Sequence, residues 1–176
     1  MTLTRRDLLI AVGSTLLAVN IPVLAAGQSQ ILIEMRGTAR GERVWFDPFG
    51  VAVKPGETLR FINRDKGNSH TVTAYHPELF ERVRRIPSAA KPFNSGYLLP
   101  GDSFELTLTV PGVYDFYCIP HESAGMVGRI VVGKPGDSGW DDSAVAAGGV
   151  AGGVEAAFPS VNDILTLSNV TAPGVK

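Results

Sequence analysis

The chain has 176 residues, of which 44% are hydrophobic and 19% are charged, and its formal net charge at pH 7 is −1. This composition is typical of a globular protein, and the near-neutral balance gives no support for binding to nucleic acid. A single cysteine, Cys118, excludes an internal disulfide bond.

The first 26 residues have the features of an export signal. Arg5 and Arg6 precede an apolar run from Leu8 to Val19, and Val23-Leu24-Ala25 supplies small residues for cleavage. The run is shorter than the roughly 20 residues that cross a bilayer, which argues against an uncleaved membrane anchor. No cysteine stands near the cleavage position, so a lipid anchor is excluded. We therefore expect residues 1–26 to be removed and the mature protein to act in the periplasm or another extracytoplasmic space, without stable membrane insertion.

The paired arginines favour the twin-arginine export route of bacteria. Leu8 and Ile10 match that signal imperfectly, so the general secretory route is the alternative. Both routes lead to the same extracytoplasmic location.

After the signal, apolar and polar residues alternate at the period of a β-strand. The clearest run is Phe104 to Val110, which would bury one face of a sheet and expose the other. Pro-Gly pairs between such runs indicate turns. The other runs are residues 31–36, 49–53, 58–63, 70–74, 113–118 and 127–132. This pattern predicts an all-β protein with an antiparallel β-sandwich, formed by a single domain over residues 30–133.

A long connection from residue 75 to residue 101 interrupts the strand pattern and carries four basic residues: Arg82, Arg84, Arg85 and Lys91. Residues 78–85 are expected to form a short helix. Long connections in compact domains are often functional. This one is either a solvated, arginine-rich excursion or a surface that attracts an acidic partner.

One short segment near residue 120 combines the residue types of a metal site. Cys118, His121 and Met126 follow one another at the spacing C-x2-H-x4-M. Soft sulfur selects Cu(I), imidazole binds both oxidation states, and a weak axial methionine completes a site of two histidines and one cysteine. Each residue alone is more often structural, as a buried cysteine, a surface histidine or a core methionine. The ordered set favours a copper site that still lacks one imidazole.

Beyond residue 133 the composition changes. Residues 134–157 are rich in glycine, alanine, aspartate and serine, which predicts a flexible linker. Ser160 and Asp163 then resemble the start of a capped helix, so the tail over residues 158–176 is expected to contain a short amphipathic helix.

Two further histidines could supply the missing ligand. His70 begins the run Thr71-Val72-Thr73, where a loop enters a strand that can lie beside Cys118 in a folded sheet. His76 precedes Pro77 and is typical of a surface loop. His70 is therefore the favoured fourth ligand, and His76 is the alternative.

The segments Phe116 to His121 and Ala124 to Gly128 resemble the copper loop of the plastocyanin/azurin-type cupredoxins, the blue copper proteins, and above all that of plastocyanin. The likeness extends over about residues 31–133. Many members have asparagine directly after the first ligand histidine, where it braces the cysteine loop. This chain has Thr71 there, so the brace is expected to differ.

The resemblance implies a Greek-key sandwich of the cupredoxin type with one copper ion per chain. His70, Cys118 and His121 would be the equatorial ligands and Met126 the weak axial one. The implied protein is a monomeric type 1 copper protein, not an enzyme. It would shuttle single electrons between redox partners such as haem or copper proteins.

Other functions remain open at this point. Copper storage or delivery usually employs exposed clusters of methionine and histidine, but Met1, Met35 and Met126 are the only methionines. A red-copper variant would use Glu122 or His76 as a ligand. A copper nitrite reductase needs a second copper with an open position, which one spare histidine cannot provide. The single cysteine also excludes a binuclear copper centre with two cysteines.

Overall fold

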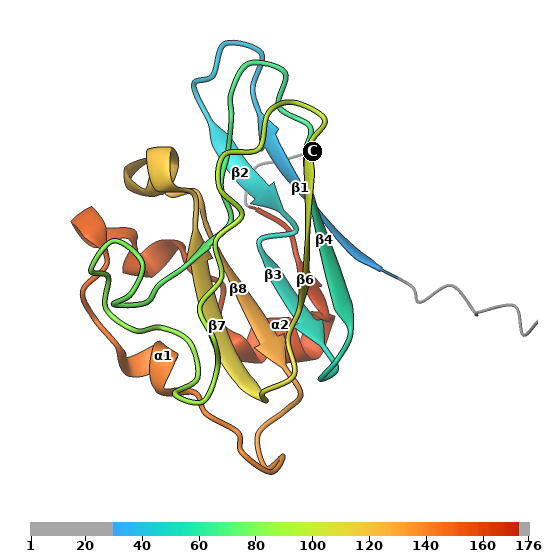
Figure 1. The fold of residues 1–176 in the computed structure, drawn as a ribbon, viewed down its shortest axis with the longest axis vertical. Helices are drawn as coiled ribbons and strands as arrows, with labels where there is room; N and C mark the ends of the chain where they lie inside the picture. The colour runs from blue at the N-terminus through green and yellow to red at the C-terminus, as the bar shows by residue number, and fades with distance from the viewer. Residues whose placement is uncertain (1–29, 173–176) are drawn as a thin grey trace, which may run out of the picture.

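The computed structural model describes residues 30–172, so the predicted export signal lies outside the described residues. Two β-sheets pack face to face in a sandwich (Figure 1). One sheet has the strand order β2-β1-β4-β6 and contains β1 (Ile31–Gly37), β2 (Val44–Asp47), β4 (Thr58–Asn63) and β6 (Ser103–Thr107). The other has the order β5-β7-β8-β3-β9 and contains β3 (Gly50–Val53), β5 (Thr73–Ala74), β7 (Gly112–Tyr117), β8 (Val127–Val132) and β9 (Asn169–Val170). Within residues 30–172, none of the helices has the length and apolar character needed to cross a bilayer.

The sandwich confirms the predicted fold class, but the expectation of antiparallel strands throughout is not met. Strand β1 runs parallel to β4, and β3 runs parallel to β8, while the remaining pairs are antiparallel. Alternation of apolar and polar residues predicts which face of a strand is buried but not the direction of its neighbour. Because each sheet contains one parallel pair, both sheets are mixed.

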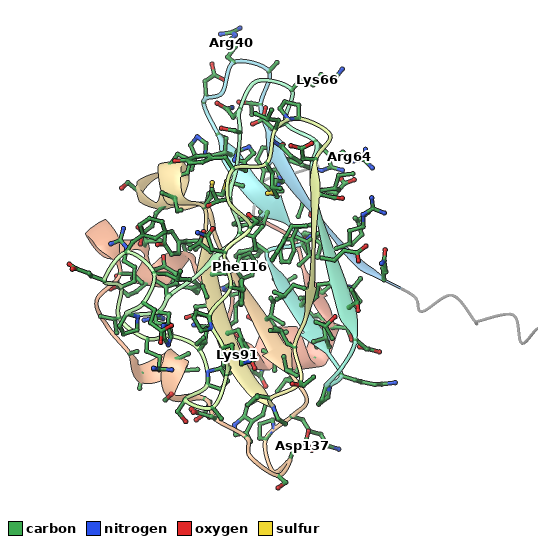
Figure 2. All side chains as sticks on the ribbon, viewed as in Figure 1. Arg40, Arg64, Lys66, Lys91, Phe116 and Asp137 are labelled. Atoms are coloured by element: carbon green, nitrogen blue, oxygen red, sulfur yellow. The ribbon has the colours of Figure 1, made fainter. Side chains whose placement is uncertain are left out.

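Three phenylalanines meet between the sheets. Phe46, Phe61 and Phe116 are all fully buried, and the ring of Phe116 lies 4.8 Å from that of Phe46 and 5.5 Å from that of Phe61, edge to face. Figure 2 shows Phe116 near the middle of the sandwich. Gly128 faces this ring from β8, and a Cβ atom there would overlap with it. Aromatic packing thus fixes strand β7, which leads directly to Cys118.

The connection over residues 75–101 contains no α-helix, so the helix expected over residues 78–85 is not formed. Phe80 and Glu81 have φ angles of 57° and 54°, in the left-handed region, which ends any helical turn at this point. Arg85 points inward and is 3% exposed, and it pairs with Asp115 on β7. Arg84 and Lys91 are exposed, so the four basic residues do not form one solvated set.

The residues after 133 lie against the sandwich. They form α1 (Ser143–Ala146), the 3₁₀ helix η2 (Ala151–Ala157) and α2 (Val161–Leu167) before β9 pairs with β3. Val150 and Val154 pack against Tyr75 and Tyr117. The structure thus differs from the predicted flexible linker, because these few apolar side chains find a buried surface. Ser160 caps α2 by accepting a hydrogen bond from the N–H of Asp163 at 3.0 Å.

Candidate metal centre

Cys118 lies at the end of β7, where the chain leaves the sheet and returns as β8 after only a few residues. Tyr117 pairs with Val127 across these strands, so the intervening segment is a tight loop. The 3₁₀ helix η1 (Ile119–Ala124) occupies most of it. In Figure 1 this turn lies at one end of the sandwich, and Figure 2 labels Asp137 at the opposite end.

Backbone hydrogen bonds close this loop and join its three candidate ligands. The N–H of Cys118 donates to Met126 O at 3.0 Å, and the N–H of His121 donates to Cys118 O at 3.0 Å. The N–H of Met126 donates to His121 O at 3.1 Å. Gly125 ends η1 with a φ angle of 82°, a left-handed conformation that favours glycine. The loop's own backbone hydrogen bonds thus hold its conformation.

His70 reaches the same end of the molecule from the loop between β4 and β5. Its backbone exchanges two hydrogen bonds with Leu98, His70 N to Leu98 O at 3.1 Å and Leu98 N to His70 O at 2.8 Å. Strand β5 begins three residues later and pairs Thr73 with Tyr117, the residue before Cys118. Pairing on both sides therefore holds His70 beside the cysteine loop.

The side chains of His70, Cys118 and His121 converge on one point. His70 Nδ1 lies 3.6 Å from Cys118 Sγ and 3.2 Å from His121 Nδ1, and His121 Nδ1 lies 3.4 Å from Cys118 Sγ. The three donor atoms lie within 4.8 Å of one another. His70 and Cys118 are fully buried, whereas His121 is half-buried. Met126 belongs to the same loop and is fully buried.

The protonation of these groups fits a copper ion. Burial lowers the pKa of His70 and the pKa of His121, so both imidazoles are neutral at pH 7, the form that binds metals. Burial raises the pKa of the Cys118 thiol to about 11, although hydrogen bonds from Thr71 oppose the rise. A cation at the point of convergence would displace the thiol proton and hold the sulfur as a thiolate. Two imidazoles and one thiolate are the equatorial set that suits copper.

Thr71, which replaces the asparagine common at this position, still braces the cysteine loop. Its backbone N–H donates to Cys118 Sγ at 3.3 Å, and its side-chain Oγ1 accepts from the N–H of Ile119 at 2.8 Å. Thr73 Oγ1 in turn donates to Thr71 Oγ1 at 3.1 Å. Thr71 thus connects the loop of His70 to the cysteine loop through its backbone N–H and its hydroxyl.

The alternative ligands His76 and Glu122 are engaged elsewhere. His76 is buried, and its Nδ1 accepts from the N–H of Glu78 at 3.2 Å. The Glu122 carboxylate accepts from Tyr75 Oη at 2.9 Å and from Arg82 at 2.6 Å. Neither side chain belongs to the group of His70, Cys118 and His121.

One residue beside the site was missed by the sequence analysis. Asp65 Oδ2 lies 3.0 Å from His70 Nε2, the ring nitrogen that faces away from Cys118. The only signal in the sequence is an acidic residue five positions before a candidate ligand. Asp65 stands in a stretch of turn-forming residues, Asn63 to Asn68, where aspartate is common for other reasons.

Comparison with known proteins agrees with this geometry. A family model described as copper binding proteins, plastocyanin/azurin family, matches residues 33–133. Chloroplastic plastocyanin of Oryza sativa subsp. indica is 38% identical over 126 residues, which cover 69% of this chain and 76% of that protein. Pseudoazurin of Paracoccus pantotrophus is 33% identical over 125 residues, with 71% and 76% covered.

Solved structures show the same similarity in three dimensions. A pseudoazurin from Sinorhizobium meliloti superposes with a TM-score of 0.55 at 29% identity, over 73% of this chain and 89% of that one. Pseudoazurin from Methylobacterium extorquens AM1 superposes with a TM-score of 0.52 over 78% of this chain and 95% of that one, and at 22% identity it supports the fold alone.

Proposed function

Because the chain belongs to the plastocyanin/azurin family of copper-binding proteins, we propose that it is an exported, monomeric blue copper protein that carries single electrons between redox partners. The observation that carries this proposal is the convergence of two imidazole nitrogens and one cysteine sulfur at the end of a sandwich. Bound copper supplies a Cu(II)/Cu(I) couple and thus the capacity for one electron.

His70, Cys118 and His121 are proposed as the equatorial ligands and Met126 as the weak axial one. Three of them belong to a loop whose backbone is closed by its own hydrogen bonds, and the fourth is held by pairing with Leu98. Thr71 connects the two parts. Donor atoms held in this way need to move little between the two oxidation states, and a small movement favours fast electron exchange.

The burial of the ligands supports a carrier rather than an enzyme. His70, Cys118 and Met126 are fully buried, which gives a substrate little access to the point between them. His121 alone is half-buried, and its loop neighbours Pro120 and Ala124 are exposed. Electrons are proposed to enter and leave through this face during brief contacts with a haem or copper protein. Transient redox contacts of this kind are small.

Copper delivery is less well supported. Of the methionines in residues 30–172, Met35 and Met126 are both fully buried and cannot present sulfur to an incoming ion.

The visible and EPR spectra of the purified protein with one equivalent of Cu(II) test the proposal. Thiolate–copper bonding should give an intense visible band, which Cys118→Ser should abolish. Met126→Leu should keep copper and shift the reduction potential, because the axial thioether is a long, weak contact. Full colour in the Cys118→Ser protein would refute the ligand assignment. A loss of copper in His76→Ala but not in His70→Ala would show that His76 is the fourth ligand.

Export through the twin-arginine route is proposed from the sequence of residues 1–26. Replacement of Arg5 and Arg6 by lysine should leave the precursor in the cytoplasm, as measured by cell fractionation. Unchanged export would indicate the general secretory route and would leave the extracytoplasmic location intact.

A further inference from the structure

A buried carboxylate touches the candidate ligand His70 on the side away from the copper site. Asp65 Oδ2 lies 3.0 Å from His70 Nε2, and the two side chains are 3% and 0% exposed. Burial of a carboxylate is costly unless hydrogen bonds compensate for the lost water. The contact therefore needs support from the surrounding residues.

That support is present on both oxygens of the carboxylate. Asp65 Oδ1 accepts from the N–H of Gly67 at 2.9 Å, and Oδ2 also accepts from Asn68 Nδ2 at 2.9 Å. The backbone N–H of Asp65 donates to Asn63 Oδ1 at 2.9 Å. The carboxylate fits closely against Gly37, where a Cβ atom would overlap with it. The carboxylate is thus held in one position.

The contact fixes which nitrogen of His70 carries the proton. Both carboxylate oxygens of Asp65 accept hydrogen bonds from fixed donors, the N–H of Gly67 and Nδ2 of Asn68, an arrangement that suits an ionised carboxylate. An ionised carboxylate only accepts hydrogen bonds, so the proton is on His70 Nε2. The lone pair of Nδ1 then points toward Cys118 Sγ and His121 Nδ1.

We propose that Asp65 is a positioning residue of the copper centre, which orients His70 through its Nε2–H group and lowers the reduction potential. This inference rests on the proposed function, since it takes His70 as a ligand. A carboxylate behind a ligand imidazole increases the basicity of the ligating nitrogen. A fixed negative charge in a buried site also stabilises the more highly charged ion, and water screens it only weakly there. Both effects favour Cu(II) over Cu(I).

Asp65→Asn tests the inference, because it removes the charge while retaining the size of the side chain. Loss of a partner of this kind typically weakens metal binding by about 10- to 100-fold. We expect Cu(II) binding to weaken about tenfold more than Cu(I) binding, which corresponds to a rise in potential of about 59 mV for a one-electron couple. Asp102→Asn is the matched control: it removes the same charge from an exposed carboxylate that accepts from Leu99 N–H. Its potential should equal that of the wild type.

The outcomes separate this inference from the proposed function. A wild-type protein without the intense visible band would refute the proposed function itself. A blue Asp65→Asn protein with an unchanged or lower potential would refute the role of Asp65 and leave the proposed function intact. A rise in reduction potential of equal size in Asp102→Asn would show a general effect of net charge. That result would also refute the role of Asp65.

A second measurement does not depend on the variant folding. NMR of the wild-type protein with Cu(I) and labelled histidine should show a slowly exchanging Nε2–H proton on His70, because that proton is buried in the hydrogen bond to Asp65. A His70 ring protonated on Nδ1, or an Nε2–H that exchanges as fast as that of an exposed imidazole, would overturn the inference.

Discussion

The side chain of Thr71 accepts a hydrogen bond from the backbone N–H of Ile119 at 2.8 Å, and this contact joins the loop that carries His70 to the loop that carries Cys118. The two residues are far apart in the sequence, and both are adjacent to a proposed ligand. Because the backbone N–H of Thr71 also donates to Cys118 Sγ at 3.3 Å, one residue fixes the sulfur and the start of its loop together.

Thr71→Val should weaken this connection while it retains the backbone contact to the sulfur. Valine has a similar shape but no hydroxyl, so the N–H of Ile119 would lose its partner at a cost of about 1–3 kcal/mol. We expect a lower free energy of unfolding and faster copper loss to a chelator, both measured against wild type. Thr58→Val is the control, since its hydroxyl bonds to Thr107 on an exposed sheet face. Equal copper loss in the two variants would contradict the role of Thr71.

A buried ion cluster holds the long connection to strand β7. Asp115 is fully buried and accepts from Arg85 Nε at 2.9 Å and from Arg129 Nε at 2.6 Å. Asp115→Asn would leave two buried guanidinium groups without a counter-charge, which typically costs about 3–5 kcal/mol. Denaturant unfolding should show a free energy of unfolding that is lower than that of wild type by this amount.

The control for Asp115 is the exposed pair of Glu42 and Arg40. Glu42→Gln should lower the free energy of unfolding by less than about 1 kcal/mol, because water screens this pair. An equally small loss of unfolding free energy in Asp115→Asn would contradict this role of the carboxylate, since water or another group would then have to replace it.

The acid stability of the protein should depend on Asp141. Its carboxylate accepts from the N–H of Ser88 at 2.8 Å and from the N–H of Ser143 at 3.0 Å, and these bonds hold its pKa well below the usual value of 3.8. A depressed pKa in the folded state stabilises the fold fully above the unfolded pKa. That contribution is lost as the pH falls below about 3.8 toward the folded pKa.

Asp141→Asn should therefore lower the free energy of unfolding by about 1 kcal/mol at pH 7, a modest value for a half-exposed group. The difference from wild type should narrow when denaturant unfolding is repeated below pH 3.8. Asp142→Asn, a neighbour whose side chain makes no cap hydrogen bond, should give no such difference at either pH. If the difference in unfolding free energy between wild type and Asp141→Asn stayed constant with pH, Asp141 would not be the source of the acid sensitivity.

The sandwich and the copper loop could be predicted because their signals are local. Alternating residues such as Phe104 to Thr107 specify a strand, and Cys118, His121 and Met126 stand close enough in the sequence to be identified together. His70 was favoured over His76 because a run of β-branched residues follows it, and the resemblance to a family then implied the same role. The alternation of apolar and polar residues does not predict whether neighbouring strands run parallel or antiparallel.

The features that were not predicted depend on partners distant in the sequence. Arg82 and Arg85 were expected either to be solvated or to attract an acidic partner, but they pair with Glu122 and Asp115 of the same chain. Val154 looked like part of a flexible, glycine-rich linker, but Tyr117 offers it a buried surface.

The half-buried His121 predicts where electrons leave the protein, and electron self-exchange between two copies tests this without a known partner. Ala124 is exposed on η1, three residues after His121. Ala124→Lys would bring like charges together when two copies meet through this face, and such charges chiefly slow association. NMR line broadening in mixtures of the oxidised and reduced protein should show self-exchange slowed by roughly tenfold. Added salt should restore part of the rate, since the Debye length falls to about 8 Å near physiological ionic strength.

Ser138→Lys provides the matched control for this variant. Ser138 is exposed and adjacent to Asp137, at the end of the sandwich opposite to η1 (Figure 2). The same added charge there should leave self-exchange unchanged, and neither substitution should alter the visible spectrum, because neither touches a proposed ligand. Slowing by Ser138→Lys of the same size would indicate a general effect of net charge. A wild-type rate in Ala124→Lys would show that electrons pass through another face.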